Sequence, residues 1–331
     1  MKKRIVLPVE IFRRLAVCLA PAWVAAAGGA LLCAQDSGSI WSDVLPELGK
    51  APESTEELKT RALGGDVQAQ YDLARRYASG MGMQADMDSA VLWYGIAAEQ
   101  GHAPAQFELA CCYETGVGVG KNERKAAHWY RRAAEQGNAC AQINLGIYCA
   151  EGRGMQRKDP EEAVRWYRKA AEQGLSQAQN NLGRCYEEGE GVERDPGQSV
   201  YWYRRAAEQG FAAAQFNLGV CCERGFGVGK DPAEAFKWYG MAARQGFPLA
   251  QYNLAIYYRN GVGTEKNPAE AARYFRLAAA QGVVQAQYNL GVCYDQGIGV
   301  ERNSAEAALW YGRAAARGFA PAKEALEKMS E

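Results

Sequence analysis

The sequence predicts an all-α protein, an α-solenoid of about seven helix-turn-helix repeats of 36 residues. Three observations predict it: a glycine that returns at a fixed period, two helical patterns that alternate within each period, and turn residues between them. The steps between these glycines are 36 residues, with one step of 37, at Gly65, Gly101, Gly137, Gly174, Gly210, Gly246, Gly282 and Gly318. Because one helix pair cannot bury its apolar faces alone, we expect the repeats to stack into a continuous core.

The first half of each repeat is predicted to form a helix, called helix A. It carries Ala-Gln, then Leu followed by Gly or Ala, as in Ala214-Gln215 with Leu218-Gly219. This spacing of large and small apolar residues is typical of a helix that packs closely on its neighbours. A glycine follows each such Leu after seven residues, here Gly225, and we expect it to end the helix in a left-handed conformation. A second glycine, here Gly227, is expected to keep the connection tight.

The second half is predicted to form helix B. It begins with Asp or Asn, often followed by Pro, as in Asp231-Pro232. An Asp or Asn side chain accepts hydrogen bonds from the first free amides of a helix, and Pro at the first position gives up an amide that has no partner. An aromatic pair and two alanines follow, as in Trp238-Tyr239 with Ala242-Ala243. We expect the aromatic pair to fill volume and the alanines to let the next helix approach.

The glycine-rich stretch GFGVGK at 225–230 looks at first like a phosphate-binding loop. Such a loop requires Gly, four residues and Gly-Lys-Ser/Thr after a buried strand. Here Lys230 is followed by Asp231, and the stretch follows a predicted helix. The sequence therefore predicts no nucleotide and no other cofactor.

The two ends differ from the repeats. Residues 1–34 have a basic start, an apolar run from Leu15 to Leu32 and a polar sequel, which predicts a signal peptide or, as the alternative, an uncleaved N-terminal anchor. We expect an exported, periplasmic or secreted protein, or one anchored in the inner membrane by that segment alone. Residues 35–53 are predicted to be a linker, 54–65 an N-terminal capping helix, 66–318 the repeats, and 319–331 a C-terminal capping helix. Without residues 1–34 the chain has 33 basic and 37 acidic residues, so no nucleic-acid partner is predicted.

A helix pair that ends in AAEQG, with AQ, NLG, GxGV, KDP and WY in order, resembles the Sel-one-like repeat (SLR). This family is a longer-looped relative of the tetratricopeptide repeat (TPR), and the resemblance covers about 66–318. It implies a right-handed superhelix of helix pairs with a concave face lined mainly by A helices. It also implies a scaffold or adaptor rather than an enzyme, in a family common among exported and membrane-associated bacterial proteins.

A ladder of polar residues stands one position before each helix-A Leu. Its members are Asp72, Glu108, Asn144, Asn181, Asn217, Asn253 and Asn289. In tetratricopeptide repeats the matching Asn can face the groove, where its amide can pair with the backbone of an extended peptide. The aromatic residues beside it are Tyr71, Phe107, Phe216, Tyr252 and Tyr288. The candidate partner-binding residues are therefore the five Asn with Tyr252 and Tyr288, and the partner is a protein or peptide of unknown identity. The alternative is that the Asn bridge adjacent helices and the aromatic rings pack between repeats.

Basic residues directly follow the aromatic pair of helix B. They are Arg131, Arg168, Arg204 and Arg276. Cations late in a helix complement its dipole, so we expect these four to form a solvated face.

Eight cysteines remain after residue 34, all on A helices. Without a C-x-x-C motif, and with two histidines in the chain, zinc and thioredoxin-like chemistry lack ligands. We expect most of them to be small buried hydrophobes. A disulfide between neighbouring A helices, such as Cys185 with Cys221 or Cys222, requires Cα atoms within roughly 7 Å.

Cysteine-rich relatives in the resembled family are described as beta-lactamase-like. This implies an alternative function, a weak beta-lactamase or penicillin-binding activity or the binding of cell-wall fragments. The chain contains no Ser-x-x-Lys, His-Glu-x-x-His or Gly-x-Ser-x-Gly motif, so no catalytic residue is predicted.

Overall fold

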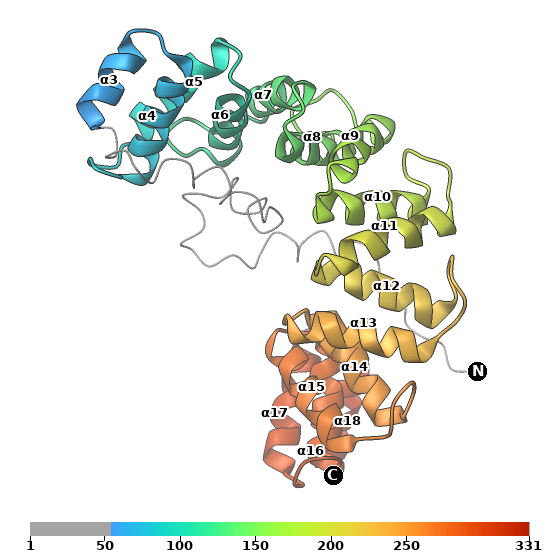
Figure 1. The fold of residues 1–331 in the computed structure, drawn as a ribbon. Coiled ribbons are helices and arrows are strands. Elements are labelled where there is room, and N and C mark those ends of the chain that lie inside the picture. The colour runs from blue at the N-terminus through green and yellow to red at the C-terminus, as the bar shows by residue number, and fades with distance from the viewer. Residues whose placement is uncertain (1–53, 331) are drawn as a thin grey trace. The chain divides into compact units, whose positions relative to one another are not determined.

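The computed structural model describes residues 54–330, which divide into two compact units between Trp166 and Tyr167. These residues contain sixteen helices and no strand, which confirms the prediction of an all-α solenoid of helix pairs (Figure 1). The predicted signal peptide or anchor at 1–34 and the predicted linker at 35–53 lie outside the described residues.

The first unit holds the first repeats. Its helices are α3 (Thr55–Leu63), α4 (Val67–Ser79), α5 (Met87–Glu99), α6 (Ala103–Thr115), α7 (Glu123–Glu135), α8 (Ala139–Glu151) and the first half of α9 (Pro160–Glu172). The A helix packs against the B helix of its own repeat in the first two repeats, α4 on α5 and α6 on α7. The B helices α5 and α7 also pack against the A helices that follow them, α6 and α8.

The second unit follows the same rule. Its helices after α9 are α10 (Ser176–Glu188), α11 (Pro196–Glu208), α12 (Ala212–Arg224), α13 (Pro232–Arg244), α14 (Pro248–Asn260), α15 (Pro268–Ala280), α16 (Val284–Gln296), α17 (Ser304–Ala316) and α18 (Ala320–Ser330). Helices α3 and α18 fall in the two segments predicted as caps (Figure 1). Within the described residues, none of the helices combines the length and the apolar character needed to cross a membrane.

Local signals set the helix ends as expected. In the fifth repeat, an Asp231 side-chain oxygen accepts hydrogen bonds from the backbone amides of Ala233 and Glu234, at 2.9 and 3.0 Å, and Pro232 is the first residue of α13. Gly225 ends α12 with φ of 73°, and its amide donates to the Cys221 carbonyl at 2.9 Å. These contacts confirm both predicted capping devices.

The second glycine of each loop contacts the preceding repeat. Gly227 has φ of 65°, and a Cβ atom there would lie 2.0 Å from the carbonyl oxygen of Pro196, the first residue of α11. Gly263 approaches the Pro232 carbonyl in the same way. The glycine therefore allows one repeat to dock on another, beyond keeping the connection tight.

The small residue after the helix-A Leu makes room for the tyrosine of helix B. Tyr239 is fully buried, and a Cβ atom at Gly219 would lie 2.8 Å from its ring. Gly291 lies against Tyr311 with the same geometry, at 2.6 Å. The core of each repeat is therefore an aromatic ring held against helix-A backbone, and the ladder residues lie at its margin.

Candidate functional site

The predicted Asn ladder lies at the edge of the core. Each Asn precedes a fully or almost fully buried Leu, so its own side chain is turned toward the rim of the repeat. The half-buried ladder residues are Asn144, Asn181, Asn217, Asn253 and Asn289. A half-buried amide is shielded from bulk water on one side and can still be reached from the other.

Three of the five Asn side chains have protein partners. The Asn217 Nδ2 donates to Asn180 Oδ1 at 2.9 Å, and Asn253 hydrogen-bonds the Tyr239 hydroxyl. Asn289 accepts from Arg259 Nη1 at 2.8 Å, and its Nδ2 donates to the Gln285 carbonyl at 2.7 Å. These contacts fit the alternative prediction that ladder Asn bridge adjacent helices and repeats.

Asn144 and Asn181 are different. No hydrogen bond joins either side-chain amide to another described residue, and both are half-buried. Asn144 lies in the first unit and Asn181 in the second. Each is therefore free to donate to and accept from a ligand.

The candidate aromatic residues pack mainly within the repeats. The rings of Tyr252 and Phe275 have centroids 6.1 Å apart, and Tyr288 lies between Tyr311 and Phe319 at 5.6 and 5.3 Å. Burial raises the pKa of Tyr252. Tyr252 and Tyr288 are both half-buried, so one edge of each ring remains accessible beside the ladder.

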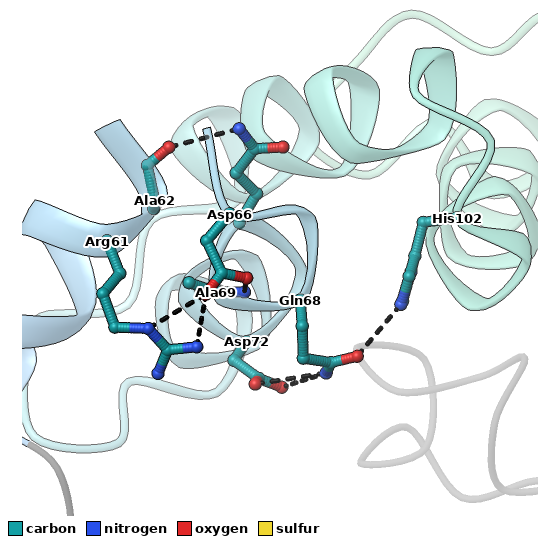
Figure 2. Close-up of polar contacts among 8 residues, drawn as sticks. Arg61, Ala62, Asp66, Gln68, Ala69, Asp72 and His102 are labelled. Atoms are coloured by element: carbon teal, nitrogen blue, oxygen red, sulfur yellow. Dashed lines mark hydrogen bonds and ion pairs between the residues drawn. The ribbon is translucent and has the colours of Figure 1, made fainter. Parts of the chain in front are cut away.

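The ladder begins with acidic residues in the first unit. Figure 2 shows Asp72 accepting both hydrogen bonds from the Gln68 amide, at 3.1 and 3.2 Å, while Gln68 Oε1 lies 3.2 Å from His102 Nε2. Glu108 is half-buried, and burial raises the pKa of its carboxyl group although Arg75 acts in the opposite direction. The ladder position of the first two repeats thus carries a carboxyl group where later repeats carry an amide.

A second ladder of polar residues, formed by glutamines, was not predicted from the sequence. The buried Gln215 donates to the Ala207 carbonyl at 3.1 Å, at the end of the preceding B helix, and accepts from Gln245 Nε2 at 2.8 Å. The pattern repeats with Gln251, which donates to the Ala243 carbonyl and accepts from Gln281. The signal for it was present, because the AQ and EQG motifs recur 30 residues apart. These glutamines are fully engaged inside the array and are not available to a ligand.

The four arginines that follow the aromatic pair connect successive repeats. Arg204 Nη2 lies 3.2 Å from Glu234 Oε1, and Arg131 pairs with Glu162 in the same way. Arg168 and Arg276 each donate to a tyrosine hydroxyl of the next A helix, at 2.8 and 2.9 Å. Arg168 and Arg276 are exposed, and Arg131 and Arg204 keep 40% and 38% of their side-chain surface exposed. The four arginines therefore face solvent, as expected, and also join successive repeats.

Seven of the eight cysteines after residue 34 are buried, as predicted for most of them, and Cys140 is half-buried. Free thiols occur at Cys111, Cys112, Cys149, Cys185, Cys221, Cys222 and Cys293. Cys140 is disulfide-bonded, and its partner lies outside the described residues. The disulfide considered between Cys185 and Cys221 or Cys222 is not formed, because all three thiols are free.

Metal ligands do not gather in residues 54–330, where no group of three or more His, Cys, Asp or Glu side chains could hold an ion.

An open hollow of about 420 Å³ lies between α16 and α18. Its lining includes Tyr288, Asp295, Arg302 and Lys328.

Two solved structures resemble the chain over most of its length. One is a protective antigen present in uropathogenic Escherichia coli strains that displays an SLR fold, with 36% identity, a TM-score of 0.78, and coverage of 83% of this chain and 58% of that one. The other is a Sel1 repeat protein from Oxalobacter formigenes, with 32% identity, a TM-score of 0.71, and coverage of 94% and 91%. The chain thus spans just over half the length of the first. No curated protein matches the chain.

The model of the Sel1 repeat matches seven consecutive stretches. They are residues 67–102, 103–138, 141–175, 176–211, 212–247, 248–283 and 284–319. These stretches contain the A and B helices, the capping residues and the glycine loops described above. The chain belongs to the Sel1 repeat family.

Proposed function

We propose that this protein is a non-enzymatic scaffold or adaptor that binds a protein or peptide segment on the concave face formed by its A helices. Sel1 repeat proteins generally act as protein-interaction scaffolds. The observation that supports a site on this face is the pair of half-buried, unpartnered amides at Asn144 and Asn181.

The chemistry of a primary amide suits an extended peptide. Its oxygen accepts from a peptide N–H and its nitrogen donates to a peptide carbonyl, so one Asn can pair with both groups of a backbone. Because each Asn is half-buried, a bound peptide would complete its hydrogen bonds where water competes less. The half-buried rings of Tyr252 and Tyr288 offer apolar contact beside the amides.

We propose that the protein acts outside the cytoplasm. The basic start and apolar run within residues 1–34 support export to the periplasm or the medium, or attachment to the inner membrane by that segment. Partners are then to be sought among envelope proteins.

The test is an array of overlapping peptides from envelope proteins, with labelled cell-wall fragments assayed in parallel. Bound peptides are titrated against the full chain and against a variant in which Asn144 and Asn181 are replaced by Ala. We expect the dissociation constant to rise at least about tenfold, since each lost hydrogen bond contributes on the order of 1 kcal/mol.

The matched control replaces Glu208, Lys237 and Glu265, which are exposed and lie off the A helices, by Ala. It should bind like the unmodified chain. Equal binding by the Asn144 and Asn181 double variant would refute the proposed face. Binding of wall fragments without any peptide would favour the alternative ligand class.

A further inference from the structure

The A helix of the fourth repeat, α10, departs from the other six at one position and from five of them at a second. Two residues before the helix-A Leu, it has Asn180 where the others carry Tyr71, Phe107, Ile143, Phe216, Tyr252 and Tyr288. Two residues after the Leu, it has Arg184 where the others carry Arg75, Cys111, Ile147, Val220, Ile256 and Val292. Among the seven A helices, α10 alone has a side-chain amide and a guanidinium at these two positions.

These residues lie together. Asn180 and Asn181 are four and three residues before Arg184 on one helix, a spacing that places their side chains side by side. From the next A helix, the Asn217 amide donates to Asn180 Oδ1 at 2.9 Å. This contact occupies the Asn180 oxygen, so that its Nδ2 donor remains. The result is a cluster of donors on α10, all within the second unit.

Arg184 forms no side-chain hydrogen bond or ion pair with the rest of residues 54–330. The side chain is half-buried, its Nε is fully buried without a hydrogen bond, and no carboxylate of the described residues forms an ion pair with it. Burial opposes its charge, but the field of Glu188 and other groups outweighs burial and raises the pKa of Arg184. A charged donor kept buried and unsatisfied is costly, which points to a group that is missing.

The equivalent arginine of the first repeat shows the contrast. Arg75 is exposed, and its guanidinium lies 5.8 Å from the centroid of the Tyr71 ring. In the fourth repeat the ring is replaced by Asn180, so Arg184 has no aromatic surface there on which to lie. The Arg184 guanidinium therefore has a polar amide beside it on α10 in place of a ring.

We propose that Arg184, together with Asn180 and Asn181, binds a carboxylate of the partner peptide. This inference rests on the proposed function and specifies its chemistry. A planar guanidinium donates two parallel hydrogen bonds to a carboxylate, which can only accept, and the Asn180 amide adds another donor. A carboxylate is favoured over a phosphate because Glu187, Glu188 and Glu190 lie on or just after the same helix. These acidic side chains repel a dianion more than a single negative charge.

The experiment uses pools of acetylated hexapeptides and the full chain. One pool carries Asp or Glu at a fixed position with an amidated end, and its matched pool carries Asn or Gln. A third has a free C-terminal carboxylate and no acidic side chain, and a fourth carries phosphoserine. Dissociation constants are measured by fluorescence anisotropy, and the Arg184 Nε–H signal is followed by NMR.

We expect a carboxylate pool to bind at least about tenfold more tightly than its neutral match, as a charge-assisted hydrogen bond implies. The Arg184 Nε–H signal should shift with saturation. The first and third pools decide whether an acidic side chain or a chain terminus supplies the group.

Arg184→Ile should abolish the preference, and Ile147 and Ile256 at equivalent positions show that the repeat accommodates this residue. Arg184→Lys, which keeps the charge without the planar fork, should retain only part of it. Arg75→Ile is the matched control and should leave the preference unchanged. Circular dichroism checks that each variant folds.

Each contrary result has a distinct meaning. Peptide binding with no difference between acidic and neutral pools, or an acidic preference that survives Arg184→Ile, overturns the carboxylate site and leaves the scaffold proposal standing. Preference for phosphoserine overturns the assignment to a carboxylate. Failure of every pool to bind, together with an empty peptide array, overturns the proposed function and this inference with it.

Discussion

At the scale of single residues, the glutamine ladder shows how the array satisfies its helix ends. Gln215 is 5% exposed and its amide uses both ends, donating to the Ala207 carbonyl and accepting from Gln245. The carbonyls at the end of a B helix would otherwise be buried beneath the next repeat without a partner. The seventh repeat breaks the pattern because Arg317 occupies the place of the B-helix glutamine, and Gln287 Oε1 is left buried and unbonded.

Arg317→Gln is therefore expected to stabilise the chain. It supplies the missing donor to Gln287, which contributes about 1–3 kcal/mol, and removes a cation near a helix C-terminus, which costs about 0.3–1 kcal/mol. The net expectation is a gain of about 1 kcal/mol in the free energy of unfolding, measured by urea denaturation. Arg317→Ala is the control, since it removes the cation and its hydrogen bond to the Gly282 carbonyl without adding a donor to Gln287. Equal unfolding midpoints for the two variants would contradict the role given to the ladder.

His102 is a residue whose protonation should matter. Its Nδ1 accepts the backbone amide of Ala105 at 3.2 Å, which caps α6, and its Nε2 contacts Gln68 (Figure 2). Burial lowers the pKa of His102, and Asp72 acts weakly in the opposite direction. The unfolded chain therefore binds the proton more readily. The stability contributed by the neutral ring is present above the ordinary pKa of about 6.5 and is lost as the pH falls through the lowered value.

His102→Asn removes this dependence and keeps the cap. Asn138 caps the next A helix by accepting from the Ala141 amide at 2.9 Å, so the substitution copies a device already used by the chain. We expect the unfolding midpoint to fall less in the variant than in the unmodified chain between about pH 7.5 and about pH 5. Asn138→His should show the reverse. A fall of the same size in all three proteins would show that His102 does not titrate with unfolding.

At the scale of elements, glycine has a different role in each of the two loops of a repeat. Gly227 lies between an A helix and a B helix, and Gly210 lies between a B helix and the next A helix. Gly227 has φ of 65° and lies against the Pro196 carbonyl, where an added Cβ atom would be 2.0 Å away. Gly210 has φ of 91°, and an added Cβ atom would meet nothing within 4 Å. Gly227 is needed for the close contact between repeats, and Gly210 is needed only for its left-handed backbone conformation.

Alanine substitution separates the two roles. Gly210→Ala should cost about 1–2 kcal/mol of unfolding free energy, from the left-handed conformation only. Gly227→Ala should cost a further 1–3 kcal/mol or so, because the methyl group forces the loop away from α11. Urea denaturation measures both. A cost for Gly227→Ala no greater than that for Gly210→Ala would mean that the loop does not hold the repeats together.

Helix limits could be predicted from the sequence because their causes are local. Asp231, Pro232 and Gly225 act within a few residues of their own positions, and each does what its residue type favours. The partners of Arg204 and Gln215 could not be predicted in this way. Each depends on a residue 30 positions away, in the next repeat or at the far end of the same one, and a charge late in a helix is equally compatible with solvent. The partners of the ladder Asn could not be predicted either, because residue type alone does not indicate which of the amides has a hydrogen-bond partner.

At the scale of the whole molecule, each unit is held by contacts between neighbouring repeats. The Gln, Arg and Gly contacts all join one repeat to the next, so stability is expected to follow nearest-neighbour coupling. The buried thiols report on this coupling. Burial raises the pKa of Cys112, Cys185 and Cys221 to about 12 and that of Cys222 and Cys293 to about 11.

Thiol labelling therefore measures how each unit opens. In the native chain near pH 8, these cysteines should resist iodoacetamide, because the reactive thiolate is scarce and the sulfur atoms are covered. With rising urea, mass spectrometry should find Cys185, Cys221, Cys222 and Cys293 labelled over one urea range, since the repeats of the second unit support one another. Cys111, Cys112 and Cys149 should likewise react together as the first unit opens. Labelling of a single cysteine well before its neighbours would show that its repeat opens alone, and the stacking energy would then be too small to make either unit a cooperative body.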